Sequence, residues 1–364
     1  MGQDRPAVGP TAAAAPQGWF RGFVIFAILL VIIHQGRDFL VPVAIALFIF
    51  ILIEAIGART RRVAIGGRTI PHWLARILSF VVVVGSVVVV VVIISHQVRE
   101  IADAAPAYAK RAQERLLELA PTIGQGASER LSQQIASFDP AELLGGLRKP
   151  LQWLLTSGIL ILFYTLFMIA ESNTFARKLP HVVGSEERAR RVMGIARSAA
   201  GAIQRYMWIN TLTSLIAAVL SYAILAITGT DFASALAILI FFTAFIPTIG
   251  TVFGIAVPAL VALLQFGLTG PFFVVLAAHF VMRMLVDNAL QPAMAGKGLN
   301  LSTLVVMLAL AFWGGMWGLA GAFLSVPLMV VILILFAQVP ALRPLAALTS
   351  SDGIVATGAE GERR

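Results

Sequence analysis

The chain has 364 residues, of which 59% are hydrophobic and only 12% are Asp, Glu, Lys or Arg. Charged residues make up about a quarter of a soluble domain, so the composition excludes a soluble fold and predicts a polytopic membrane protein. The net charge of +9 would suggest a nucleic-acid partner for a soluble protein. For this chain we expect the lipid bilayer as the partner and no nucleic acid.

The sequence predicts an all-α fold with about eight hydrophobic segments, most of which reach or approach the roughly 20 residues that cross a bilayer as a helix. A Pro- and Ala-rich stretch precedes them and is predicted to be a disordered tail without a cleavable signal peptide. The valine-rich run 81–94 has the composition of a strand, but lipid supplies no backbone partners, so we expect a helix. The segments are 20–33, 39–56, 77–95, 153–170, 208–227, 232–266, 272–290 and 301–337.

Basic residues gather in two stretches, 59–76 and 171–205. The positive-inside rule places both stretches, together with the N- and C-termini, in the cytoplasm. Residues 96–150 hold seven basic and seven acidic residues, which predicts an extracytoplasmic segment. Its apolar residues recur at loosely helical spacing, so we expect amphipathic helices. These helices either pack against their own bundle or a neighbouring subunit, or cap the exit of a pathway.

Helix-breaking residues interrupt two of the segments. In 232–266 the break contains Pro247, Gly250 and Gly254, and it leaves two arms of about 15 residues that are too short to cross the bilayer. We therefore expect a re-entrant hairpin. The second break lies in 301–337 and contains Trp313, Gly314, Gly315, Trp317, Gly318 and Gly321, followed by Pro327.

The two broken segments share a GxxxG pattern followed by a Val-Pro pair. If they enter from opposite sides of the membrane, they form an inverted repeat, in which transporters bind substrate between broken helices near the midplane. Together with the charge pattern, these breaks predict six regions. They are a disordered tail (1–18), N-terminal transmembrane helices (19–95), an extracytoplasmic helical segment (96–150), a transmembrane helix with a basic cytoplasmic segment (151–207), a transport core with both hairpins (208–338) and a disordered C-terminal tail (339–364).

Ionisable side chains lie on one face of the segment 272–290. His279, Arg283 and Asp287 are spaced i, i+4, i+8, so they form a stripe on one side of a helix. An ionised group near the bilayer centre costs about 2.5 to 3.5 kcal/mol, so the stripe needs a reason to be there. The Arg–Asp pair is either a structural ion pair or a switchable site that couples protons or substrate to transport. His279 taken alone is more typical of packing.

Other polar residues are candidates for a transport pathway. Asn288 and Gln291 follow the charged stripe and either line a polar vestibule or cap helices. Asn210 lies on the segment 208–227. Thr248 and Thr251 flank the Pro-Gly break, where open carbonyl groups could receive a polar solute or a cation. Trp313, in the second break, is a candidate for gating or for plain packing.

Missing motifs exclude several classes of protein. Cysteine is absent, which removes disulfides, thiolate nucleophiles and cysteine metal sites. The sequence contains no GxxxxGK[ST] phosphate-binding loop, and neither HExxH nor GxSxG occurs. We therefore expect a protein that is not an enzyme, uses no cofactor or metal, and is driven by a gradient or by another subunit.

Three motifs resemble the autoinducer-2 exporter family: FIPTIG (245–250), VDNALQP (286–292) and FWGGMWGLAGAFLSVPL (312–328). The resemblance implies a homo-oligomer, for example a pentamer, in the bacterial inner membrane that exports a small polar signalling molecule with the proton gradient. It also implies that a mobile part carrying both hairpins shifts against a fixed scaffold. The family's motif positions fall on Ile246, Pro247, Gly250, Asp287, Asn288, Pro292, Gly318, Gly321, Val326 and Pro327.

Three hypotheses follow. The first is a proton-coupled exporter of a small hydrophilic solute such as autoinducer-2, with its site between the two breaks. The second is a Na⁺/H⁺ antiporter, because other members of the family resemble antiporters of monovalent cations and protons. The third is a membrane scaffold that does not transport and binds partners through the segment 96–150.

Overall fold

The computed structural model describes residues 15–61, 64–65, 68–123, 140–295 and 302–349. Nearly all of these residues are helical. Seven helices in the described part of the chain are long and apolar enough to cross a membrane, judged by length and composition. The helices are α1 (Ala15–Gln35), α2 (Arg37–Thr60), α3 (His72–Ile123), α5 (Pro140–Val183), α6 (Glu186–Thr228), α7 (Ala233–Thr243), α8 (Ile249–Phe266), α9 (Gly270–Leu285), α10 (Gln291–Ala295), α11 (Thr303–Gln338) and α12 (Arg343–Thr349), with a π-helix η1 (Val286–Leu290) and a 3₁₀ turn η3 (Pro340–Leu342).

The prediction of a polytopic helical protein is confirmed, with one addition. Strands β1 (Ala64–Ile65) and β2 (Arg68–Thr69) form a two-residue antiparallel pair in the basic loop between α2 and α3. The valine-rich run is helical, as predicted, and lies within α3. The eight predicted segments correspond to the seven long helices and two shorter apolar helices, Phe20–Gln35 and Ala233–Thr243.

Two helices continue through predicted region boundaries. Helix α3 has 52 residues and passes from its apolar part into the predicted extracytoplasmic segment without a break. Helix α6 has 43 residues, so the basic stretch and the following apolar segment form one rod. Ser185 caps the start of α6 by accepting a hydrogen bond from the Arg188 backbone N–H at 3.2 Å, and Gly229 ends it with a φ of 68°. Each helix is continuous because neither junction contains a helix breaker.

The predicted tails are partly helical. Helix α1 begins at Ala15, and residues 340–349 form η3 and α12 instead of a disordered tail. The C-terminal turn is held by tertiary contacts: the Ser302 N–H donates to the Thr349 carbonyl at 3.1 Å, and Arg343 Nε donates to the Ala337 carbonyl at 3.1 Å. The first contact links residues 47 positions apart, so composition alone did not reveal it.

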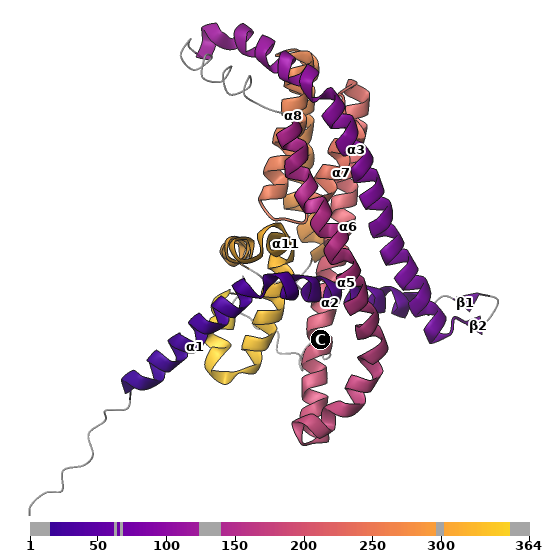
Figure 1. The fold of residues 1–364 in the computed structure, drawn as a ribbon, viewed down its shortest axis with the longest axis vertical. Helices are drawn as coiled ribbons and strands as arrows, with labels where there is room; N and C mark the ends of the chain where they lie inside the picture. The colour runs from indigo at the N-terminus through magenta and orange to yellow at the C-terminus, as the bar shows by residue number, and fades with distance from the viewer. Residues whose placement is uncertain (1–14, 62–63, 66–67, 124–139, 296–301, 350–364) are drawn as a thin grey trace, which may run out of the picture.

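Figure 1 shows α3, α5, α6 and the α7–α8 pair as long rods, with α2 crossing the bundle at a steep angle. Helix α2 contacts α3, α5, α6 and α11 and contributes Phe48 and Ile51 to a core cluster with Ile203 of α6 and Leu324 of α11. Arg76 of α3 forms an ion pair with Glu54 of α2 at 2.7 Å and donates to Ser172 of α5 at 3.4 Å. Arg76 thus links α3 to both α2 and α5 through polar contacts.

Candidate functional site

The first predicted break separates α7 from α8. Gly250 lies so close to the Thr243 carbonyl oxygen that a side chain at position 250 would overlap it. Thr248 has a φ of 65°, which is strained for a β-branched residue. Because Pro247 has no N–H, the Thr243 carbonyl accepts from Ile246 N–H at 2.9 Å in a tighter turn. The arms have 11 and 18 residues, so the prediction that both are too short to cross the bilayer is wrong for α8, which is long and apolar enough to cross.

The second break lies inside α11, where Gly318 has φ 62° and ψ −140°. A side chain at Gly321 would overlap the Trp313 carbonyl oxygen, and one at Gly314 would lie 3.8 Å from Ala322 Cβ. Residues eight apart on a straight helix are separated by about 12 Å along the axis, so the chain must turn sharply back here. The rings of Trp313 and Trp317 lie 4.9 Å apart at the turn.

The two breaks meet. The ring of Phe245, in the turn between α7 and α8, stacks on Phe323, just after the Gly318 and Gly321 turn, with centroids 5.0 Å apart. Tyr206 of α6 donates from Oη to the Phe245 carbonyl at 3.5 Å and packs against Val326 in a buried cluster. Segments about 80 residues apart in the chain are thus joined at the points where their helices are interrupted.

A charged cluster joins α8 to the end of α9. Arg283 Nη2 lies 3.0 Å from Asp287 Oδ1 and donates to Thr251 Oγ1 at 3.2 Å, while Thr251 Oγ1 donates to Asp287 Oδ2 at 2.6 Å. Arg283 is only 4% exposed. A side chain at Gly254 would lie 3.3 Å from Arg283 Cδ, so the glycine lets the arginine stem lie against α8. Thr251 therefore links the ion pair to the helix that follows the first break.

The carboxylate of this cluster lies in the π-helix η1, which continues directly from α9. Single π-helical turns are rare within α-helices and often occur at functional sites. Asp287 contacts α8, whereas the adjacent Asn288 is exposed and, within the described part of the chain, donates only to the Met284 carbonyl of its own helix at 3.1 Å. Of these two residues, only Asp287 connects different helices.

A polar seam runs between α6 and the antiparallel α9, η1 and α10. Gln291 Nε2 donates to Asn210 Oδ1 at 3.0 Å at one end. At the other end, Ser221 Oγ lies 2.9 Å from His279 Nε2, and His279 Nδ1 lies 2.9 Å from the Val275 carbonyl. Between them on α6, the hydroxyl of Ser214 is buried and has no hydrogen-bond partner among the residues that the structure describes. The seam thus offers one free buried hydroxyl between two satisfied pairs.

The Ser221–His279 hydrogen bond leads to a stability prediction. Ser221→Ala should lower the free energy of unfolding by about 1 kcal/mol, because it removes one buried neutral hydrogen bond. Thermal unfolding in detergent, followed by the loss of monodisperse protein, measures this change. Ser95→Ala is the matched control, because Ser95 bonds only the Val91 carbonyl of its own helix. An equal loss in both variants would contradict a role in joining α6 to α9.

The structure sorts the predicted site residues, apart from the exposed Asn288, into three groups. Arg283, Asp287, Thr251 and Gly254 meet in the charged cluster, while Asn210, Gln291 and His279 lie along the seam. Pro247, Thr248, Gly250, Trp313, Gly314, Gly318 and Gly321 form the two breaks. Sequence reasoning missed Ser221, although Asn210, Ser214 and Ser221 at i, i+4 and i+11 share one face of a helix and carried that signal.

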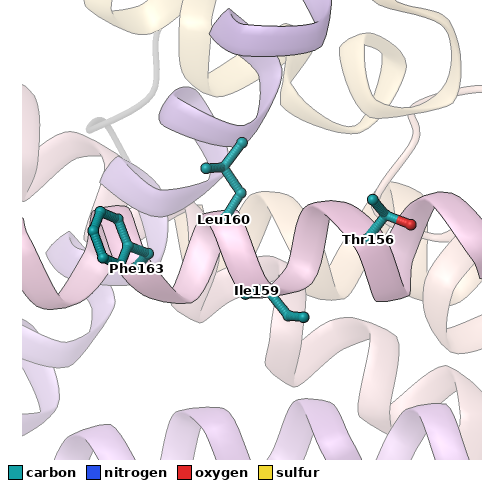
Figure 2. A pocket seen from close by; sticks show the side chains of 4 residues that line it. All are labelled: Thr156, Ile159, Leu160 and Phe163. Carbon is teal, nitrogen blue, oxygen red and sulfur yellow. The ribbon is translucent and has the colours of Figure 1, made fainter.

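A shallow pocket on α5 lies apart from these elements. It is lined by Thr156, Ile159, Leu160 and Phe163, and Figure 2 shows all four side chains on one stretch of α5. The lining is mostly apolar, and Ile159 is 76% exposed. None of the four residues belongs to the helices that carry the charged cluster, so we do not assign the pocket to the site.

Comparison with known proteins identifies the family of this chain. The family model of the AI-2E family transporters matches residues 23–341. The AI-2 transport protein TqsA of Escherichia coli K12 is 29% identical over 332 residues, which cover 90% of this chain and 93% of TqsA. A Haemophilus influenzae protein named "Putative transport protein" is 30% identical over 320 residues, which cover 84% of this chain and 88% of the relative. The chain therefore belongs to the AI-2E transporter family.

Proposed function

We propose that this protein is a secondary exporter that moves a small polar molecule, such as autoinducer-2, across the bacterial inner membrane with the proton gradient. The observation that carries the proposal is the Arg283–Asp287 pair, whose arginine is buried and which Thr251 ties to a broken helical hairpin. An intramembrane ion pair is costly and often functional. The similarity to TqsA, which is named for AI-2 transport, supports this choice of solute.

The two broken segments are proposed to be re-entrant hairpins of an inverted repeat. Helix α7 has 11 residues and spans about 16 Å, roughly half of the hydrocarbon core. The Phe245–Phe323 stack supports an arrangement in which the two turns face each other. Hairpins that meet at their turns approach from opposite sides, as in transporters that bind substrate near the midplane.

Coupling is proposed to act through the protonation of Asp287. When ionised, Asp287 neutralises Arg283 and accepts the Thr251 hydroxyl, which holds α8 against η1. A proton on Asp287 removes the negative charge of the carboxylate. Arg283 is then a buried charge without its counter-ion, which is strongly unfavourable. The cluster then has to rearrange, so the position of α8 depends on the proton. This step is how we link proton movement to hairpin movement.

His279 is assigned a packing role within this proposal. Both of its ring nitrogens are satisfied, one by Ser221 of α6 and the other by the Val275 carbonyl, and the side chain is fully buried. The seam residues Asn210 and Gln291, with the unpaired Ser214 hydroxyl between the two satisfied pairs, are proposed to contact a hydroxylated solute. An unsatisfied buried hydroxyl is a favourable place for a solute hydrogen bond.

The orientation and assembly are also proposals. Exposed basic residues flank the turn between α5 and α6, so this end and both termini are placed in the cytoplasm. Helices α1, α3 and α5 expose large apolar side chains, including Phe20, Trp73 and Phe167. Lipid and neighbouring subunits of a homo-oligomer are the proposed partners of these surfaces.

Side-by-side efflux from proteoliposomes containing only this protein tests the function. We expect efflux of autoinducer-2 that requires an imposed pH gradient and stops when an uncoupler dissipates the gradient. Collapse of the pH gradient by Na⁺, with no movement of autoinducer-2, would identify a cation antiporter instead. No flux of either solute from folded, inserted protein would favour a scaffold that does not transport.

The link between hairpin and ion pair predicts a large effect of Thr251→Val. The variant keeps both charges but removes the hydroxyl that joins α8 to Asp287. Proton-driven efflux should fall roughly tenfold, because the free energy of one hydrogen bond to a charged group corresponds to about that change in rate. Thr243→Val is the matched control, because the Thr243 hydroxyl donates to the Leu239 carbonyl of its own helix at 2.9 Å. Equal efflux by the two variants would remove Thr251 from the coupling path.

A further inference from the structure

The part of α3 that lies beyond its apolar span contacts the transport core. Tyr108 Oη donates to Asp231 Oδ2 at 2.7 Å, and Arg111 Nη1 lies 3.4 Å from the same oxygen. The Tyr108 ring also packs against Phe232, with centroids 5.3 Å apart. A second contact joins Ser234 Oγ to Gln97 Oε1 at 3.3 Å. Helix α3 of the N-terminal half and the transport core thus meet at specific polar side chains.

Asp231 also connects the two arms of the first broken hairpin. Its backbone N–H donates to Gln265 Oε1 at 2.8 Å, and Gln265 Nε2 donates to Asp231 Oδ1 at 3.2 Å and to the Gly229 carbonyl at 2.9 Å. Asp231 lies just before α7 and Gln265 at the end of α8. Through this one carboxylate, α3 is tied to the open end of the hairpin, opposite the turn that meets α11.

The chemistry of the contact makes it specific and reversible. Burial, then the hydrogen bond to Asp231 and its negative charge, raise the pKa of Tyr108, so the phenol stays protonated and donates. Arg111 and Asp231 are both 43% exposed, and ion pairs open to solvent are weak. Near its other end, α3 is fixed to α2 and α5 by Arg76. Helix α3 therefore bridges a well-anchored part of the protein and a weakly held hairpin end.

We propose that α3 from Gln97 to Arg111 is a clasp that holds the open end of the α7–α8 hairpin and must release it during each transport cycle. The inference rests on the proposed transport function, since the release has a purpose only if the hairpin moves. The clasp gives the predicted extracytoplasmic segment a role in controlling the hairpin. If the segment served only for packing, the contact between α3 and the hairpin would stay closed throughout the cycle.

The absence of native cysteine allows a direct test. In a variant with Gln97→Cys and Ser234→Cys, oxidation joins α3 to α7 across the clasp. We expect proton-driven efflux of autoinducer-2 to fall to background in the oxidised protein and to return after reduction. The matched control is Phe39→Cys with Tyr164→Cys, which joins α2 to α5 where the two rings lie 5.8 Å apart. Undiminished efflux by the fully cross-linked clasp variant would overturn the proposal.

A second measurement does not depend on transport. The initial rate of disulfide formation between Gln97→Cys and Ser234→Cys should fall severalfold when Asp231→Asn or Tyr108→Phe is added, because the clasp then opens more often. Tyr222→Phe, on the exposed face of α6, should leave the rate unchanged. If the rates behave in this way but no reduced protein moves autoinducer-2, the proposed function fails and the clasp stands. Equal rates in all variants would overturn the clasp whatever is transported.

Discussion

Asp287→Asn should reduce proton-driven efflux of autoinducer-2 from proteoliposomes to background. Asparagine keeps the size of the side chain and can still accept the Thr251 hydroxyl, but it cannot neutralise Arg283 or exchange a proton. The loss should appear in transport at every imposed pH gradient. Asp38→Asn is the matched control, since Asp38 lies on α2 with its side chain 92% exposed.

Loss of folding could mimic this result, because removing one partner of a buried ion pair costs about 3 to 5 kcal/mol. A second variant, Arg283→Met with Asp287→Leu, removes both charges and leaves none uncompensated. Replacements of this kind are often neutral or stabilising by about 1 to 4 kcal/mol. We expect this double variant to insert and to unfold at or above the wild-type temperature, yet to show no gradient-driven efflux. Normal efflux would show that the pair is only structural.

Gly321→Val should destabilise the protein by at least about 3 kcal/mol, at the upper end of the cost of overpacking. The first atom of any side chain at this position would overlap the Trp313 carbonyl oxygen and crowd Trp317, and a backbone carbonyl cannot rotate away as a side chain can. The turn would have to open, which would separate Phe323 from Phe245. Thermal unfolding in detergent should show a large decrease, and efflux should be lost with it.

Gly315→Ala provides the control for Gly321→Val. Gly315 belongs to the same glycine cluster, but a side chain there meets no atom of the described residues within 4 Å. Alanine favours a helix over glycine by about 1 kcal/mol, so this variant should be as stable as wild type or slightly more stable. Equal destabilisation by the two substitutions would mean that the cluster acts through general flexibility and not through one close approach.

Local features of the sequence predicted much of this architecture. Long apolar runs marked the spanning helices because lipid leaves a backbone no other regular structure to adopt at this length. Pro247, Gly250 and Gly318 marked the breaks because their effects on the backbone depend on few neighbours. The continuous helix from Glu186 to Thr228 was missed, since a change from basic to apolar composition resembles a boundary although the helix does not end there.

A polytopic helical membrane protein, two interrupted segments and a stripe of ionisable residues could all be predicted from the sequence, because each depends on composition or on residues within a few turns of one another. The family followed from the resemblance of three short motifs and from the family model. The contacts of Thr251 with Arg283 and Asp287, of Phe245 with Phe323, and of Tyr108 with Asp231 appear only in the folded protein. These contacts span 32 to 123 positions along the chain. Helical periodicity shows which face of a helix is polar, but it does not show which other helix that face will meet.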